Sequence, residues 1–164
     1  MNKNRLIAWA VTACVMVLSV VVGVTITYSG KRDEVLSVFE AQILPAASRA
    51  SLIRGDLHRL EERYLDTSFE LMILPATMRD PDDVSEWLDR LIHCFVQSSE
   101  LLVEVDMLDT RHDFFIGAME NFAEQILIIR QSEYNRMARN FNDRLNQDLG
   151  FMARPLVREL PTFD

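Results

Sequence analysis

Three arginines, Arg49, Arg54 and Arg63, are the side chains in this chain whose spacing best suits ligand binding. They flank a seam of apolar residues that recurs every three or four positions, with Arg49 and Arg63 on one side of the seam and Arg54 on the other. A guanidinium donates paired hydrogen bonds to a carboxylate or a similar anion. The sequence therefore predicts a small anionic ligand here. The competing interpretation is that these arginines pair with acidic residues of a neighbouring helix.

No residues have the spacing of a catalytic site. His58, Glu61 and Glu62 fall within one helical turn and could ligate a metal, but this arrangement is more often a solvated polar face. The sequence holds neither a glycine-rich phosphate loop nor the context of a serine nucleophile. We therefore expect no enzyme activity, no metal site and no cofactor.

These residues follow an uncharged run from Leu6 to Tyr28. As a helix this run is about 34 Å long, enough to cross a hydrocarbon core of about 30 Å. Lys3 and Arg5 precede it without any acid, which favours an N-terminus in the cytoplasm. The sequence predicts a single-pass protein of the inner (cytoplasmic) membrane, with the remaining chain outside or in the periplasm.

Two other interpretations of the apolar run stay open. A cleaved signal peptide would have a shorter apolar core and a small-residue cleavage site. Val11-Thr12-Ala13-Cys14 resembles a lipoprotein cleavage box, but cleavage there would leave a strongly apolar stretch directly behind the lipidated Cys14. An uncleaved membrane helix is therefore the preferred interpretation.

The part after the anchor is acidic. All 25 acidic residues but only 15 of the 17 Lys and Arg follow the apolar run, which gives this part a formal charge of −10. That charge argues against nucleic acid as a partner and against broad docking on anionic lipid. Cys94 is the only cysteine outside the anchor, so no internal disulfide can form there.

Helical periodicity divides the rest of the chain into three long segments. The first runs from about Lys31 to Leu74, with Pro45 expected to kink the helix and Ser29-Gly30 able to break or hinge. Its heptad seam consists of Leu36, Phe39, Ile43, Ala46, Ala50, Ile53, Leu57, Leu60, Tyr64, Thr67, Leu71 and Leu74.

The second segment runs from about Pro81 to Met107 behind Asp80 as N-cap, and the third from about His112 to Leu149 with a stutter near Glu133. The predicted fold class is all-α: an anchor over residues 1–30, an extracytoplasmic antiparallel helical bundle over 31–150, and an irregular tail over 151–164. The first helix is longer than its neighbours, so we expect a homodimer or a hetero-complex to complete the bundle through this long helix.

The order of segments resembles a known group. An apolar N-terminal helix leads into a long helix that carries Ile43-Leu44-Pro45-Ala46, and Leu101-Leu102 later precede a short turn and an aromatic-rich helix. The pattern is similar to the extracytoplasmic helical-bundle sensor domains of bacterial chemoreceptors and sensor histidine kinases. The resemblance covers roughly residues 1–150 and implies signal transduction by a chemoreceptor-like four-helix bundle.

Members of that group return through a second membrane helix, and this sequence holds one apolar run. Two expectations follow. The chain is either a membrane-anchored sensory module that detects a small ligand or a periplasmic partner, as the N-terminal part of a longer receptor, or a non-catalytic accessory subunit or scaffold of an envelope complex.

Overall fold

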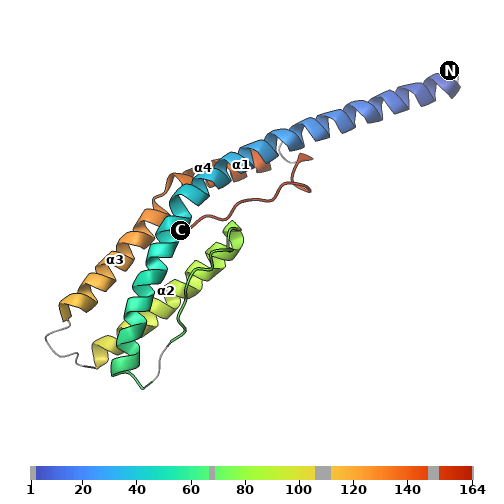
Figure 1. The fold of residues 1–164 in the computed structure, drawn as a ribbon. Coiled ribbons are helices and arrows are strands. Elements are labelled where there is room, and N and C mark those ends of the chain that lie inside the picture. Colours follow the sequence, from blue (N-terminus) through green and yellow to red (C-terminus); the bar gives the residue numbers. More distant parts are fainter. Residues whose placement is uncertain (1–2, 67–68, 106–111, 148–151, 164) are drawn as a thin grey trace.

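The computed structural model describes residues 3–66, 69–105, 112–147 and 152–163. Four helices follow one another in this part of the chain: α1 (Lys3–Tyr64), α2 (Pro81–Glu104), α3 (His112–Arg130) and α4 (Glu133–Asn146). The described residues contain no strand. The prediction of an all-α chain with one long apolar N-terminal helix is confirmed (Figure 1).

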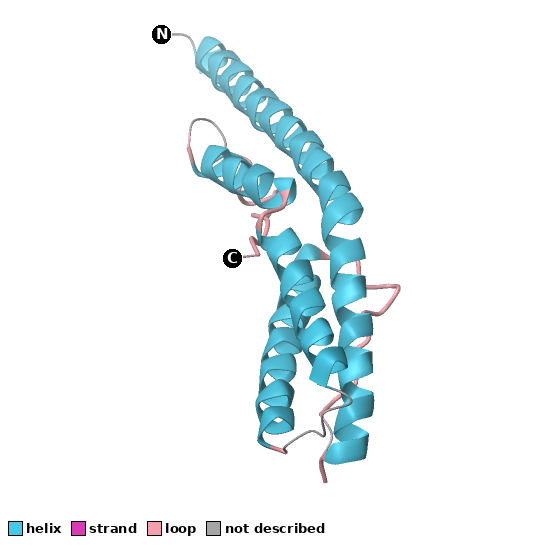
Figure 2. Ribbon diagram, turned by 90° about the vertical axis from the view of Figure 1, so that its left-hand side faces the viewer, coloured by secondary structure: helices cyan, strands magenta, loops and turns pink. Residues whose placement is uncertain are grey.

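Helix α1 is continuous over 62 residues, which corresponds to about 93 Å along its axis, and it curves between its apolar end and its packed half (Figure 1). Its N-terminal third projects away from the other helices, and every side chain from Trp9 to Val20 is exposed (Figure 2). Among the described helices, α1 alone is long and apolar enough to cross a membrane. Ser29 and Gly30 are helical, so the chain does not break at this joint. Pro45 lies inside α1, on its exposed face, and does not end the helix; that it kinks the helix stays a prediction.

The C-terminal half of α1 buries its apolar seam. Six seam residues are almost fully inaccessible: Phe39, Ile43, Ala46, Ala50, Leu57 and Leu60. Helices α2, α3 and α4 all contact α1 and supply this cover. The heptad spacing therefore identified the buried face of α1 correctly.

The prediction that this helix continues to Leu74 is wrong, because α1 ends at Tyr64. The chain then turns back: the backbone N–H of Phe69 donates to the Glu61 carboxylate at 3.0 Å. Beyond the turn the seam is lost, since Leu71 is 44% exposed while Met72 is 5% exposed. The hydrogen bond from the Phe69 backbone to the Glu61 side chain outweighs an apolar periodicity that would allow nearly three further helical turns.

Helix α2 begins as the sequence predicted. The Asp80 carboxylate accepts a hydrogen bond from the backbone N–H two residues later, and Pro81 occupies the first turn. Pro81 and Phe39 line one hollow at the start of α2, whereas Ser98 near its end is hydrogen-bonded to Glu61. Helix α2 therefore runs in the same direction as α1, not antiparallel to it, because residues 69–80 return along α1 without helical structure.

The predicted long helix from His112 to Leu149 is two helices. They separate at Gln131 and Ser132, close to where the heptad spacing fails, and the Ser132 hydroxyl caps α4. The backbone N–H of Glu133 donates to the Gln42 side chain at 3.0 Å. From there α4 runs back along α1 towards the apolar end (Figure 1).

The tail is irregular, as predicted, but it belongs to the core. Four of its side chains are buried: Ala153, Val157, Leu160 and Phe163. The Asn135 side chain donates to the Phe163 carbonyl and accepts from its N–H, both at 2.9 Å. The Phe163 ring lies 6.1 Å from that of Phe39 and 5.7 Å from that of Tyr134. The seam of α1 is thus covered within the chain, so it gives no argument for a dimer or a hetero-complex.

Candidate functional site

The three arginines predicted to bind an anion lie in different surroundings. Arg49 and Arg63 are exposed, while Arg54 has no accessible surface. Arg54 already faces a carboxylate, so an anionic ligand would have to displace a buried acid there. Anion binding by Arg49 and Arg63 stays a prediction.

Arg54 and Glu61 form a buried ion pair one heptad apart on α1. Arg54 Nη1 lies 2.7 Å from Glu61 Oε1, and both side chains are 0% exposed. Arg54 Nη2 donates to the Glu61 carboxylate at 3.0 Å and to the carbonyl of Glu70 at 3.2 Å. The hydroxyl of Ser98 on α2 donates to Glu61 Oε1, the oxygen that also faces Arg54 Nη1. The pair therefore fastens α2 and the returning segment to α1.

These contacts set the ionisation of Glu61. Burial raises its pKa, but hydrogen bonds from Arg54 and Ser98 and the Arg54 charge lower it more, so the pKa lies below the ordinary value. His58 Nδ1 lies 3.1 Å from Glu61 and its Nε2 lies 3.6 Å from Glu62. The residues considered as metal ligands thus belong to this ion-pair network. In the described part of the chain, no group of three or more acidic, histidine or cysteine side chains is arranged to hold a metal ion.

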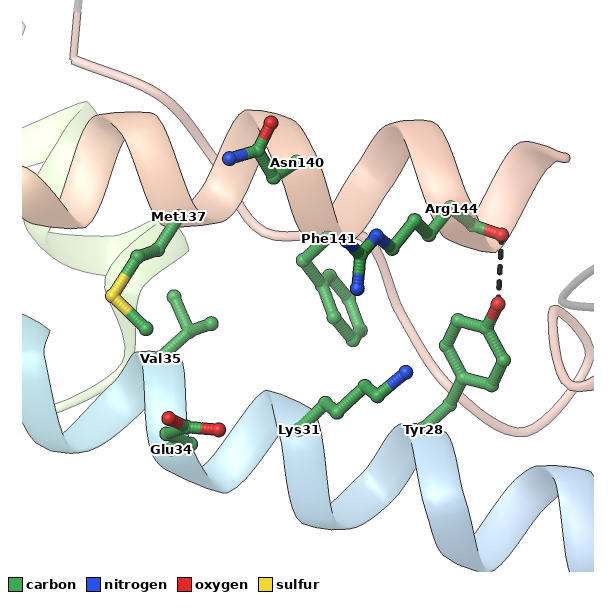
Figure 3. A pocket seen from close by; sticks show the side chains of 8 residues that line it. All are labelled: Tyr28, Lys31, Glu34, Val35, Met137, Asn140, Phe141 and Arg144. Atoms are coloured by element: carbon green, nitrogen blue, oxygen red, sulfur yellow. Dashed lines mark hydrogen bonds between the residues drawn. The ribbon is translucent and has the colours of Figure 1, made fainter.

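A second site lies between α1 and α4, where α1 leaves the packed domain. Figure 3 shows this cavity of about 210 Å³ with side chains from both helices around it. Its polar lining consists of Tyr28, Lys31, Glu34, Asn140 and Arg144, and its apolar lining of Val35, Met137 and Phe141. Sequence analysis did not identify this site, because its residues come from segments more than 100 positions apart.

Tyr28 positions the two helices at this cavity. It is 8% exposed, and its hydroxyl donates to the carbonyl of Arg144 at 2.9 Å. Its ring packs edge-on against Phe141 with centroids 6.2 Å apart, and Lys31 Nζ lies 5.2 Å from the ring centroid. Tyr28 is thus both the last residue of the uncharged run and the residue that fixes the last turn of α4.

The cavity brings two cations together. Lys31 and Arg144 both extend into the space between the helices, while Glu34 lies at the opposite end (Figure 3). Neither cation forms an ion pair with another described residue. An ammonium and a guanidinium that share a partly apolar hollow can bind an anion.

Comparisons with known proteins do not place this chain in a group. No family model, no curated protein and no solved structure matches it.

Proposed function

We propose that this chain is a membrane-anchored helical sensory module, in which a change in the packed domain shifts α1 and so moves its membrane segment. The N-terminus would lie in the cytoplasm and the packed domain outside or in the periplasm. The charge distribution around the apolar run and the resemblance to bacterial sensor domains support this assignment.

The continuity of α1 is the observation that carries the proposal. A helix can pass a small shift or rotation along its axis only if its hydrogen-bond ladder is unbroken. Residues 3–64 form one helix, with no turn between the exposed apolar third and the part packed in the core. Tyr28 and its bond to Arg144 hold α4 against α1 close to the point where the packed domain ends.

A distance measurement tests whether α1 is rigid across this joint. The full chain with Cys94→Ala and Ser48→Cys would carry nitroxides at Cys14 and position 48 and be placed in lipid nanodiscs. Thirty-four helical steps correspond to about 51 Å, so pulsed electron paramagnetic resonance should give one narrow distribution near 50 Å.

Gly30→Pro is the control, because proline removes a backbone donor and clashes with the preceding turn. It should broaden or displace the distribution. If the chain without Gly30→Pro already gives a distribution as broad as this control, α1 is jointed and the signalling proposal fails.

An accessory or scaffold role is the second candidate. Apolar side chains on the outer faces of α2 and α3 favour it: Val103 is 67% exposed, Phe114 53% and Leu127 52%. Mass measurement after purification in mild detergent separates the two roles. A stoichiometric complex that Val103→Ser with Phe114→Ser disrupts would support the scaffold, whereas recovery of the chain alone would argue against it.

A further inference from the structure

The cavity between α1 and α4 lies next to the end of the apolar run. Tyr28 is the last residue of that run, and Lys31 follows three residues later. Three helical steps are about 4.5 Å. If the apolar run spans a bilayer, this distance places Lys31 in the polar headgroup layer, which is about 5–7 Å thick on each side of the hydrocarbon core.

Helix α4 carries Arg144 to the same level. The bond between the Tyr28 hydroxyl and the Arg144 carbonyl fixes the last turn of α4 beside the end of the apolar run. This bond also occupies one of the unpaired carbonyls that would otherwise present negative charge at a helix C-terminus. The Arg144 side chain then lines the same hollow as Lys31.

The local charge differs from that of the whole domain. Glu34 is the only acid among the residues that line the cavity, and it lies at the end away from the Lys31 ammonium (Figure 3). A neighbouring hollow at the same level of α1 contains Arg32 and Arg158 together with Asp33. Charges farther away than about 8–10 Å are largely screened at physiological ionic strength. The acids at the distal end of the domain therefore do not cancel this basic site.

We propose that the cavity binds the headgroup phosphate of an anionic membrane lipid between Lys31 and Arg144, with Val35, Met137 and Phe141 beside its apolar part. This inference rests on the proposed membrane span of α1. A lipid phosphate is the preferred occupant because the cavity lies beside the end of the apolar run and its volume of about 210 Å³ suits a small anionic group. The bound lipid would join α1 to α4 and so stabilise α1 at the point where it leaves the packed domain.

Hydrogen exchange of the full chain in nanodiscs tests this proposal. Nanodiscs of phosphatidylcholine alone are compared with nanodiscs that contain phosphatidylcholine and phosphatidylglycerol in equal amounts. Phosphatidylglycerol should slow exchange of the amides in the last turns of α4 about tenfold, which corresponds to about 1.4 kcal/mol. The reason is that these turns can open only after the bound lipid dissociates, so the lipid makes opening rarer.

Matched variants identify the site. Lys31→Gln with Arg144→Gln should abolish the protection, while Arg139→Gln, which removes the same charge from the same helix outside the cavity, should leave it. Glu34→Gln should increase the protection because it removes the one acid in the lining, and this variant stays informative if the double variant folds poorly. Equal protection in the double variant and the unmodified chain would overturn the proposal.

Two further measurements distinguish a failure of the lipid assignment from a failure of the proposed membrane span. Inorganic phosphate added to phosphatidylcholine nanodiscs should give no protection; protection equal to that by phosphatidylglycerol would overturn the lipid assignment. Alkaline carbonate extraction of membranes reports the span itself. A chain that carbonate releases contradicts the membrane anchor, whereas a retained chain without a phosphatidylglycerol effect contradicts the lipid site alone.

Discussion

Arg54 and Glu61 are both inaccessible to solvent and lie on one face of α1. Removing two charges from water is costly, and hydrogen bonds from Ser98 and the Phe69 backbone to the carboxylate offset part of that cost. A partner for Arg54 was foreseen on another helix, but the fold supplies it from the same helix. The pair works structurally: it ends α1 and holds the returning segment.

Glu61→Gln should destabilise the protein by about 3–5 kcal/mol, because it leaves Arg54 buried without its counter-charge. The free energy of unfolding is measured by urea denaturation of the full chain in detergent. Glu62→Gln is the matched control, since the Glu62 side chain is 63% exposed, and should cost at most about 1 kcal/mol. Equal losses in the two variants would contradict the structural role of the pair.

The same pair predicts a pH dependence. The pKa of Glu61 is lower in the folded chain than the ordinary glutamate value of 4.5. Its stabilising contribution is therefore complete above pH 4.5 and disappears as the pH falls through the lower, folded-state pKa. The stability difference between the unmodified chain and Glu61→Gln should shrink over this acidic range. A difference that stays constant below pH 4.5 would show that ionised Glu61 is not responsible.

At the scale of elements, the C-terminal segment is the main surprise. It has no regular secondary structure over most of its length, yet two asparagines of α4 bind its backbone: Asn135 pairs with Phe163, and Asn142 with Leu160 at 2.7 and 2.9 Å. The Phe163 ring then fills the space beside Phe39 and Tyr134. This segment therefore forms part of the core, and helical periodicity in the sequence does not reveal this because the segment is not helical over most of its length.

Phe163→Ala should lower the free energy of unfolding by about 3–5 kcal/mol, as expected for removal of a large side chain from a packed core. Leu156→Ala is the control in the same segment, because Leu156 is 71% exposed, and should change stability by at most about 0.5 kcal/mol. Urea denaturation of the full chain measures both. If Phe163→Ala is as mild as the control, the tail does not complete the core.

At the scale of the whole molecule, α1 links an exposed apolar end to a packed domain. The exposed run from Trp9 to Val20 lies within the segment that a membrane would cover, and the packed domain begins near Tyr28. If the domain lies outside the cytoplasm, exposed positions on its part of α1 must be accessible from the medium.

A membrane-impermeant maleimide tests this orientation in intact cells. Ser48→Cys should be labelled because position 48 is exposed. The unmodified chain is the control and should not react, since Cys14 lies in the apolar run and Cys94 is buried. Labelling of Ser48→Cys only after the cells are lysed would place the domain in the cytoplasm and contradict the predicted orientation.

The sequence by itself determined the features that depend on neighbours along the chain. Local spacing of residues determines the uncharged apolar run and the buried face of α1 through Leu60. A local hydrogen bond determines the cap of α2 at Asp80. The interruption near Glu133 was visible as a fault in the apolar repeat, although its outcome, two helices in place of a stuttering one, was not.

Only the tertiary structure decided how distant segments meet. Helix α1 ends at Tyr64 because Glu61 binds the Phe69 backbone, and α2 runs parallel to α1 with Ser98 bound to Glu61. Phe163 is buried where Asn135 binds its backbone. The cavity between α1 and α4 likewise exists because Tyr28 reaches Arg144, 116 positions away. Periodicity shows which face of a helix is buried, but not which segment covers it. Many apolar segments can cover the same face, and specific polar contacts select among them.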